Sequence, residues 1–210
     1  SFVPMGVNAE VHQVTLRNDS DAPKDVILTS FVEFCLWNAQ DDMTNFQRNF
    51  STGEVEVEGS VIYHKTEYRE RRNHYAFYAV NTPVDGFDTD METFLGLYNG
   101  FENPQAVFTG KMGNSIASGW QPMAAHQVKV SLAPGEERRF NFVLGYVEVP
   151  QAEKFVAPSV INKAPAKALL EKLTTDEQIA DAFNALKKHW DNLLSAYVLT
   201  TPDEKLGRMV

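Results

Sequence analysis

From residue 11 to about residue 149, short runs of β-branched and aromatic residues alternate with turn residues. The first two runs predict strands at residues 11–16 and 26–34, separated by a polar turn that contains Pro23. Alternating apolar and polar positions give each strand one packed face and one solvated face. We expect these two strands to form a hairpin.

Further strands are predicted at residues 54–58, 60–63, 74–80, 127–132 and 139–147. The first of these reads Glu-Val-Glu-Val-Glu and places three carboxylates on one face. Pro134 and Gly135 supply a tight turn between the last two, which we expect to pair as antiparallel partners. So many short strands at this spacing predict a mainly β protein with an antiparallel β-sandwich.

Beyond Pro150 the apolar period changes to that of a helix. Residues 164–173 predict a short helix, and Thr174 with Glu177 has the spacing of a capping box for a second one, which Pro202 ends. This helix carries an apolar stripe that the sandwich, a downstream domain or a second subunit must cover: Ile179, Phe183, Leu186, Trp190, Leu193 and Tyr197. We therefore expect a sandwich at residues 1–150 and a helical segment at residues 151–210.

Composition limits the range of partners. The net charge of −9, with scattered acidic residues, lacks the basic stripe that nucleic acid or an anionic membrane requires. The single cysteine, Cys35, lies in an apolar run and cannot form an internal disulfide, which favours an inert thiol in a reducing compartment. No apolar stretch is long enough to span a bilayer. We expect a cytoplasmic protein that contacts neither nucleic acid nor membrane.

The most informative junction lies at residues 31–49, where an apolar run turns into a loop rich in amides. Asn38, Asn45, Gln47 and Arg48 offer fixed donors and acceptors that suit sugar hydroxyls or a phosphate. Alternatively, the amides cap a turn while Arg48 pairs with a neighbouring aspartate. The residue types alone leave both interpretations open.

Other candidate chemistry is weaker. The histidines and the one cysteine show no metal-ligand spacing, so we expect no metal. No nucleophile elbow, phosphate loop, dinucleotide fingerprint or placed carboxylate pair is present, so the sequence gives no support for an esterase, a kinase, a dehydrogenase or a hydrolase. The basic cluster from Lys65 to His74 contains Glu67 and Glu70, which favours a salt-bridged connection over phosphate contact. Trp120 suits either stacking on a sugar ring or packing beside a turn.

Four strings, at residues 31–48, 60–77, 96–100 and 114–120, resemble the cellobiose-phosphorylase group of glycoside hydrolase family 94. The resemblance implies a supersandwich like that of galactose mutarotase, with its N-terminal strands missing here, and a helical linker toward an absent (α/α)6-barrel catalytic domain. It implies a glycosyltransferase that converts cellobiose and phosphate to α-glucose 1-phosphate and glucose with inversion, without a cofactor. The catalytic groups of such enzymes lie in the barrel, so the resemblance implies that this chain alone is inactive.

The same resemblance implies a homodimer in which a sandwich loop borders the acceptor-sugar end of the partner's active site. The positions matching that loop are Asn38, Asn45, Gln47 and Arg48. Two alternatives remain. One is a free-standing carbohydrate-binding module that uses Trp120 or a similar aromatic residue. The other is an independent sandwich enzyme, such as a sugar epimerase, with His64 and Glu67 or His74 and Glu70 in one pocket.

Overall fold

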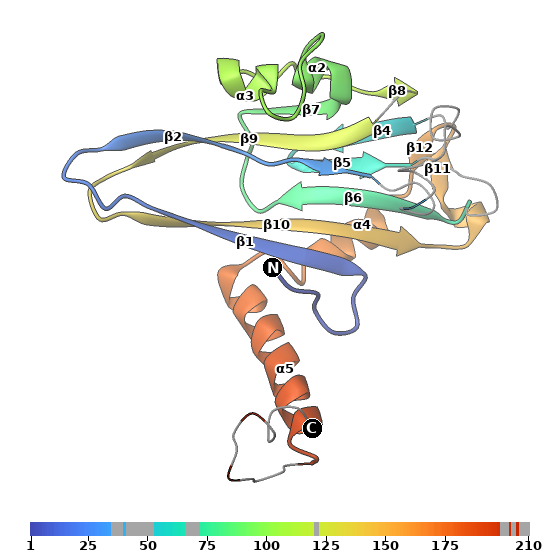
Figure 1. Ribbon diagram of the computed structural model, residues 1–210. Coiled ribbons are helices and arrows are strands. Elements are labelled where there is room, and N and C mark those ends of the chain that lie inside the picture. Colours follow the sequence, from blue (N-terminus) through green and yellow to red (C-terminus); the bar gives the residue numbers. More distant parts are fainter. Residues whose placement is uncertain are drawn as a thin grey trace.

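The structure is a computed structural model that describes residues 1–34, 40, 53–65, 72–119, 122–197, 202 and 205. Within these residues two antiparallel sheets are stacked, with short helices on one outer face and longer helices on the other (Figure 1). The predicted mainly β, antiparallel sandwich is therefore confirmed.

In the described part of the chain, the larger sheet has six strands in the order β1-β10-β6-β5-β4-β8. The bounds of these strands are β1 (Ala9–Arg17), β4 (Gly53–Glu58), β5 (Val61–His64), β6 (His74–Val80), β8 (Ser118–Gly119) and β10 (Glu137–Glu148). The smaller sheet is built around a long strand that pairs with two strands on one side and one on the other: β9 (Pro122–Leu132) with β2 (Lys24–Thr29), β3 (Val32–Glu33) and β7 (Gly86–Asp90).

The two turns that we expected to close hairpins instead carry the chain from one sheet to the other. β1 pairs with β10, whereas β2 pairs with β9. The crossings lie together, because Asn18 N donates to Glu136 O (3.0 Å) and Gly135 N donates to Asn18 O (2.8 Å). Leu132 and Phe140, on either side of the second crossing, are both buried in the core between the sheets. Burying apolar residues from two stacked sheets stabilises the crossing over a flat hairpin.

The C-terminal segment (residues 151–194) covers the outer face of the larger sheet. It contains η2 (Gln151–Glu153), the hairpin of β11 (Phe155–Ala157) and β12 (Val160–Ile161), α4 (Ala164–Leu170) and α5 (Asp176–Leu194). Ala166, Leu173 and Ile179 are buried here against Tyr63 and Phe77 of the sheet. The two predicted helices are thus confirmed, although α4 is shorter than predicted, and the β11–β12 hairpin before them was not predicted.

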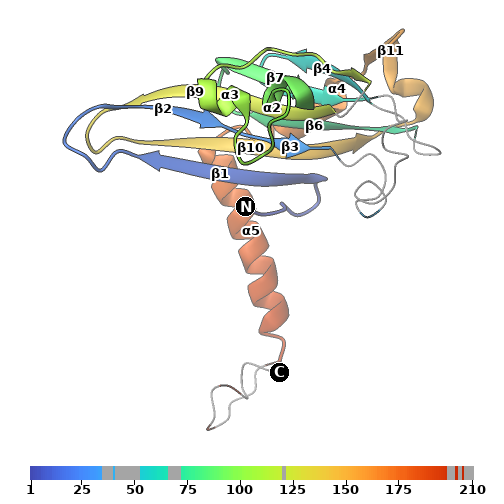
Figure 2. The same ribbon diagram turned by 45° about the horizontal axis from the view of Figure 1, so that its top comes forward.

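α5 begins one residue later than the predicted capping box. Thr175 is the cap residue, and its hydroxyl accepts from Gln178 N at 3.2 Å while Gln178 Oε1 accepts from Thr175 N at 3.0 Å. Thr174 is engaged elsewhere, because its hydroxyl donates to Leu170 O. From this cap α5 projects away from the sandwich (Figures 1 and 2), and Ile179 is its buried residue.

A pair of short helices on the outer face of the smaller sheet was not predicted. α2 (Met91–Leu95) starts where the Asp90 side chain accepts from Thr93 N at 2.8 Å. α3 (Gln105–Thr109) starts after Pro104 and ends at Gly110, which adopts the left-handed conformation. Aspartate, proline and glycine at these places are helix-boundary signals, but five-residue helices carry too little periodicity to recognise from sequence. We name residues 91–109 the α2–α3 cap.

Candidate functional site

The described residues that flank three segments singled out in the sequence lie at one end of the sandwich. The described strands fix their starting points: Gly53 of β4 pairs with Gly119 of β8, and Glu33 of β3 pairs with Met123 of β9. At the end of β5, Lys65 N donates to Glu54 O at 3.0 Å. The residues that flank segments 35–52, 66–71 and 120–121 are therefore neighbours in space. We name this region the loop end of the sandwich.

Gly53 shows how closely the described residues that flank segments 35–52 and 120–121 approach each other. A Cβ atom placed on Gly53 would lie 2.4 Å from Pro122 Cγ and 2.7 Å from Gly119 O. No side chain fits in this space without moving one of the two chain segments. The absence of a side chain thus allows the strand that follows segment 35–52 to pack directly against the residues around position 120.

The residues that the sequence predicts for ligand binding lie outside the described part of the chain. This applies to Asn38, Asn45, Gln47 and Arg48, and equally to Trp120 and Cys35. Their roles remain predictions. The structure instead locates the residues on both sides of them, namely Phe34 and Gly53 for the first loop and Gly119 and Pro122 for Trp120.

The floor of the loop end contains a buried histidine. His64 is 4% exposed and its ring stacks on Phe34 with centroids 4.8 Å apart. Burial lowers the pKa of His64 to about 3, so the imidazole is neutral at physiological pH. A second buried histidine, His126 of β9, stacks on Tyr78, and burial lowers its pKa to about 4. In an epimerase His64 would need Glu67 beside it, and Glu67 lies outside the described residues.

The three glutamates of β4 face the C-terminal segment and form a lysine–glutamate ladder with it. Lys163 Nζ lies 2.9 Å from Glu56 Oε2 and 3.3 Å from Glu58 Oε2, and Lys167 also pairs with Glu58. Lys65 Nζ lies 3.2 Å from Glu56 Oε1 and 3.5 Å from Glu54 Oε2. For Lys65, the predicted salt-bridged connection is confirmed.

Glu56 is the centre of this ladder. Burial by itself raises the pKa of the carboxyl, but hydrogen bonds from Ile161 N at 2.9 Å, Lys163 and Lys65 outweigh burial and lower it. The hydrogen bond with Glu56 is the main cause of the raised pKa of Lys163. Both ions are therefore charged at neutral pH. The alternating glutamates were visible in the sequence, but their lysine partners about 100 residues away were not.

A buried carboxylate also orders the chain that leads to Trp120. Asp88 is fully buried and accepts hydrogen bonds from Gly113 N (3.0 Å), Ser115 N (3.0 Å) and Ser115 Oγ (2.7 Å). Asn114 between them has a φ of 54° and accepts from Phe87 N. This carboxylate therefore fixes the segment that continues into β8. Sequence reasoning missed Asp88, because nothing in the sequence distinguishes it from the neighbouring Asp85 and Asp90.

Two cavities border the described residues. One of about 480 Å³ lies at the loop end, between Glu54 and the β11–β12 hairpin. The other, of about 540 Å³, lies at the opposite end of β5, next to Leu170 of α4. Asn81 and Asn141 line this second cavity, and their polar groups already form hydrogen bonds within the fold. Asn141 N donates to Asn81 Oδ1, and Asn141 Nδ2 donates to Asp176 Oδ1.

Two further observations concern metals and membranes. In the described part of the chain, no group of three or more His, Cys, Asp or Glu residues is placed to hold a metal ion. None of the helices found there is long and apolar enough to cross a membrane.

Comparison with known proteins identifies the relatives of this chain. It is 30% identical over 210 residues to an N,N'-diacetylchitobiose phosphorylase of Vibrio proteolyticus, with 100% of this chain and 24% of that protein covered. It is 27% identical over 187 residues to a solabiose phosphorylase of Paenibacillus borealis, covering 85% of this chain and 24% of the relative. The chain thus spans about a quarter of the length of these curated relatives.

A solved structure shares the fold. A putative kojibiose phosphorylase from human microbiome superposes with a TM-score of 0.50 at 8% identity, over 87% of this chain and 19% of the other. In addition, residues 1–176 match the family described as "Glycosyl hydrolase 94, supersandwich domain". Together with the two stacked antiparallel sheets, this match establishes that the chain belongs to the glycosyl hydrolase 94 supersandwich domain family.

Proposed function

We propose that this chain is the non-catalytic sandwich and helical linker of a disaccharide phosphorylase. The observation that carries the proposal is the convergence of the strand ends at Gly53, Gly119 and Pro122, which flank the segments of the sequence that contain the amide residues and Trp120. Family membership and the phosphorylase relatives support it. We assign the complete protein the conversion of cellobiose and phosphate to α-glucose 1-phosphate and glucose with inversion, in the cytoplasm.

Phosphorolysis with inversion requires few protein groups, and this chain would not need to supply them. A phosphate oxygen attacks the anomeric carbon from the face opposite the leaving group, the glycosidic bond breaks, and one carboxylic acid protonates the departing oxygen. In the described residues, the buried carboxylate of Asp88 and the partly buried carboxylate of Glu56 already accept several hydrogen bonds within the fold. These engagements support the assignment of the catalytic acid and the phosphate-binding groups to another domain.

The contribution of this chain is acceptor selection. Asn38, Asn45, Gln47 and Arg48 would hydrogen-bond the hydroxyls of the acceptor sugar in the active site of a second subunit, within a homodimer. Fixed amide and guanidinium donors suit this task because a site built to bond a hydroxyl rejects a sugar that lacks it. The relatives are named for different disaccharides, N,N'-diacetylchitobiose and solabiose, which supports differences in sugar recognition among family members.

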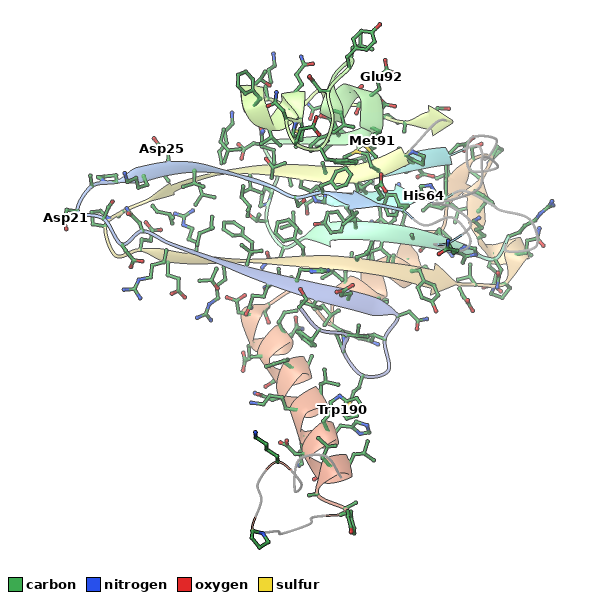
Figure 3. The ribbon with its side chains drawn as sticks, in the orientation of Figure 1. Asp21, Asp25, His64, Met91, Glu92 and Trp190 are labelled. Carbon is green, nitrogen blue, oxygen red and sulfur yellow. The ribbon has the colours of Figure 1, made fainter. Side chains whose placement is uncertain are left out.

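The C-terminal segment would act as the linker to the catalytic domain. α5 exposes apolar side chains along its length, including Trp190 (50% exposed), Leu193 (56%) and Tyr197 (65%) (Figure 3 labels Trp190). A solvated helix does not retain such a stripe, so the following domain would cover it. The lysine–glutamate ladder would hold α4, which precedes α5, on the sandwich.

The alternative is a free-standing carbohydrate-binding module. Release of α-glucose 1-phosphate from cellobiose and phosphate, by the complete polypeptide and by this chain alone, separates the two. The proposal expects activity only in the complete protein. Activity of the short chain would place the catalytic acid here, and inactivity of both with every disaccharide offered would favour the binding module. Offering N,N'-diacetylchitobiose beside cellobiose tests the substrate assignment, since a clear preference for the acetylated sugar would reject cellobiose.

A further inference from the structure

The connection between α2 and α3 contains the single Asn-Gly pair of the chain, Asn99–Gly100. Figure 1 shows this connection on the outer side of the smaller sheet, where it extends away from the sandwich. The Asn99 residue is exposed, and it follows Tyr98, whose side chain is fully exposed as well. Solvent therefore has free access to the Asn99 side chain.

An asparagine that precedes a glycine can lose its side-chain amide in an intramolecular reaction. The backbone nitrogen of the following residue attacks Cγ of the asparagine and closes a succinimide ring, and proximity makes this step far faster than attack by a separate amine. Glycine favours the ring closure because it has no Cβ atom to hinder the approach of its nitrogen. The reaction also requires a side chain and a backbone nitrogen that no hydrogen bond holds in place.

At Asn99 both reacting groups meet this requirement within the described part of the chain. No described residue forms a hydrogen bond with the Asn99 side-chain amide or with Gly100 N. The hydrogen bonds of the turn engage other atoms, because Asn99 N donates to Gly96 O at 3.2 Å and Asn103 N donates to Gly100 O at 3.1 Å. The turn thus holds the backbone on both sides of the reacting pair and leaves the pair itself open.

The pair Asn114–Ser115 shows how the fold prevents the same reaction elsewhere. Asn114 Oδ1 accepts from Phe87 N at 3.1 Å, and Ser115 N, which is the nitrogen that would attack, donates to Asp88 Oδ1 at 3.0 Å. The Asp88 carboxylate is fully buried, so this bond is shielded from water. Ring closure at Asn114 would therefore break two hydrogen bonds of the fold, and the tertiary structure separates the protected asparagine from the open one.

We propose that Asn99 is a site of spontaneous deamidation and isomerisation. Gly100 N forms a bond to Asn99 Cγ, the bond from Cγ to Nδ2 breaks, and the side-chain nitrogen leaves as ammonia with the proton that Gly100 N gives up. Water then opens the succinimide at one of its two carbonyl carbons and yields an aspartate or an isoaspartate at position 99. The sum is one water consumed and one ammonia released, so the reaction needs neither an oxidant nor a cofactor.

The modification changes the outer side of the α2–α3 cap. It places a new carboxylate beside exposed apolar side chains, namely Leu97, Tyr98 and Phe101. The Glu102 carboxylate is also close, because a Cβ atom on Gly100 would lie 2.4 Å from Glu102 Oε2. An isoaspartate in addition inserts a methylene group into the backbone of the turn. The tip of the cap therefore becomes more acidic as the molecule ages.

The test is incubation of the complete polypeptide at neutral pH in water labelled with heavy oxygen, followed by peptide mapping with mass spectrometry. We expect the peptide that contains Asn99 to take up the label and to separate into two products, while the peptide that contains Asn114 stays unlabelled. In urea the Asn114 peptide should also take up the label, because unfolding breaks the bonds to Phe87 and Asp88.

Gly100→Ala is the matched variant. Gly100 does not adopt a left-handed backbone, and an added Cβ would meet the flexible end of the Glu102 side chain, so the variant should fold and show an unchanged circular dichroism spectrum. It should slow label uptake at Asn99 by at least about tenfold. An Asn99 peptide that stays unlabelled in the wild type overturns the proposal. Equal uptake at Asn99 and Asn114 in the folded protein, or an unchanged rate in Gly100→Ala, overturns it as well.

Discussion

The ammonium of Lys163 lies 2.9 Å from Glu56 Oε2 and joins the C-terminal segment to the sheet. Glu56 simultaneously accepts from Ile161 N and from Lys65, so one carboxylate connects β4, the end of β5 and β12. Because the Glu56 side chain is only 16% exposed, these bonds are partly shielded from water. The pair is thus the main polar attachment of the segment that carries α5.

Glu56→Gln should loosen that attachment while keeping its shape. The loss of charge weakens the bonds from both lysines, and we expect the free energy of unfolding to fall by about 1–3 kcal/mol. Urea denaturation measures this, and hydrogen exchange of residues 155–170 should accelerate. Glu137→Gln is the control, because its pair with Arg139 is largely exposed, and equal effects in both variants would contradict the role of Glu56.

Gly53→Ala should disturb the loop end through steric overlap. The added methyl group would lie 2.4 Å from Pro122 Cγ, so the free energy of unfolding should fall by about 1–3 kcal/mol as the strands separate. The comparison is Gly59→Ala, where the space is open and only a φ of +60° opposes the substitution. In the complete protein, Gly53→Ala should also raise the acceptor KM and Gly59→Ala should not. An unchanged acceptor KM in Gly53→Ala would show that the close contact between Gly53 and Pro122 does not affect acceptor binding.

Acid should destabilise the protein before its carboxylates are protonated. The pKa values of His64 and His126 are about 3 and 4 when folded, whereas an unfolded histidine titrates near 6.5. Between these values the unfolded state binds more protons, so the stability present above pH 6.5 falls as the pH decreases toward 4, by a few kcal/mol in total. The urea midpoint as a function of pH measures this loss.

His126→Leu isolates one of the two histidines. Both ring nitrogens of His126 are buried and have no hydrogen-bond partner among the described residues, so replacement by leucine removes one titrating group without breaking a hydrogen bond seen there. The decline between pH 6.5 and 4 should become shallower than in the wild type, whereas replacement of the exposed His189 should leave it unchanged. An identical decline in His126→Leu would show that other groups cause the acid sensitivity.

Asp88→Asn should release the segment before β8. An amide offers one acceptor oxygen in place of the two carboxylate oxygens that accept from Gly113 and Ser115. We expect a loss of about 2–4 kcal/mol in the free energy of unfolding, because a buried charged acceptor is removed and a donor is left facing an N–H. Asp25→Asn, whose partner Ser131 is exposed, should change it by less than about 1 kcal/mol. Equal losses would argue against the proposed role.

Arg48→Ala tests the acceptor loop in the complete protein. Removing the guanidinium should raise the KM for glucose as acceptor in the reverse reaction by about tenfold, from the loss of charge-assisted hydrogen bonds. The KM for phosphate should stay unchanged. The control is Arg138→Ala, which removes an exposed arginine paired with Glu136 at the other end of the sandwich. An unaltered acceptor KM would reject the assignment of Arg48.

The sequence by itself determined most of the secondary structure. Runs of β-branched and aromatic residues identified β1, β2, β4, β5, β6, β10 and the second half of β9, and the four- and three-residue spacing of Ile179 and its followers identified α5. The strands β7, β8, β11 and β12 were not predicted. The period of apolar residues depends only on which face of a strand or helix is buried, so it can be recognised without knowing what that face packs against. The short helices α2 and α3 were not predicted, because five residues are too few to show a helical period.

Only the tertiary structure decided which strands pair and which polar groups meet. Local turn chemistry at Pro134 and Gly135 is the same for a hairpin and for a crossing between sheets, and burial in the core selected the crossing. The pairing of Glu56 with Lys163 and the contact of Gly53 with Pro122 join residues far apart in the chain. No local pattern records such contacts, because their energy arises from packing and from removal of water on folding.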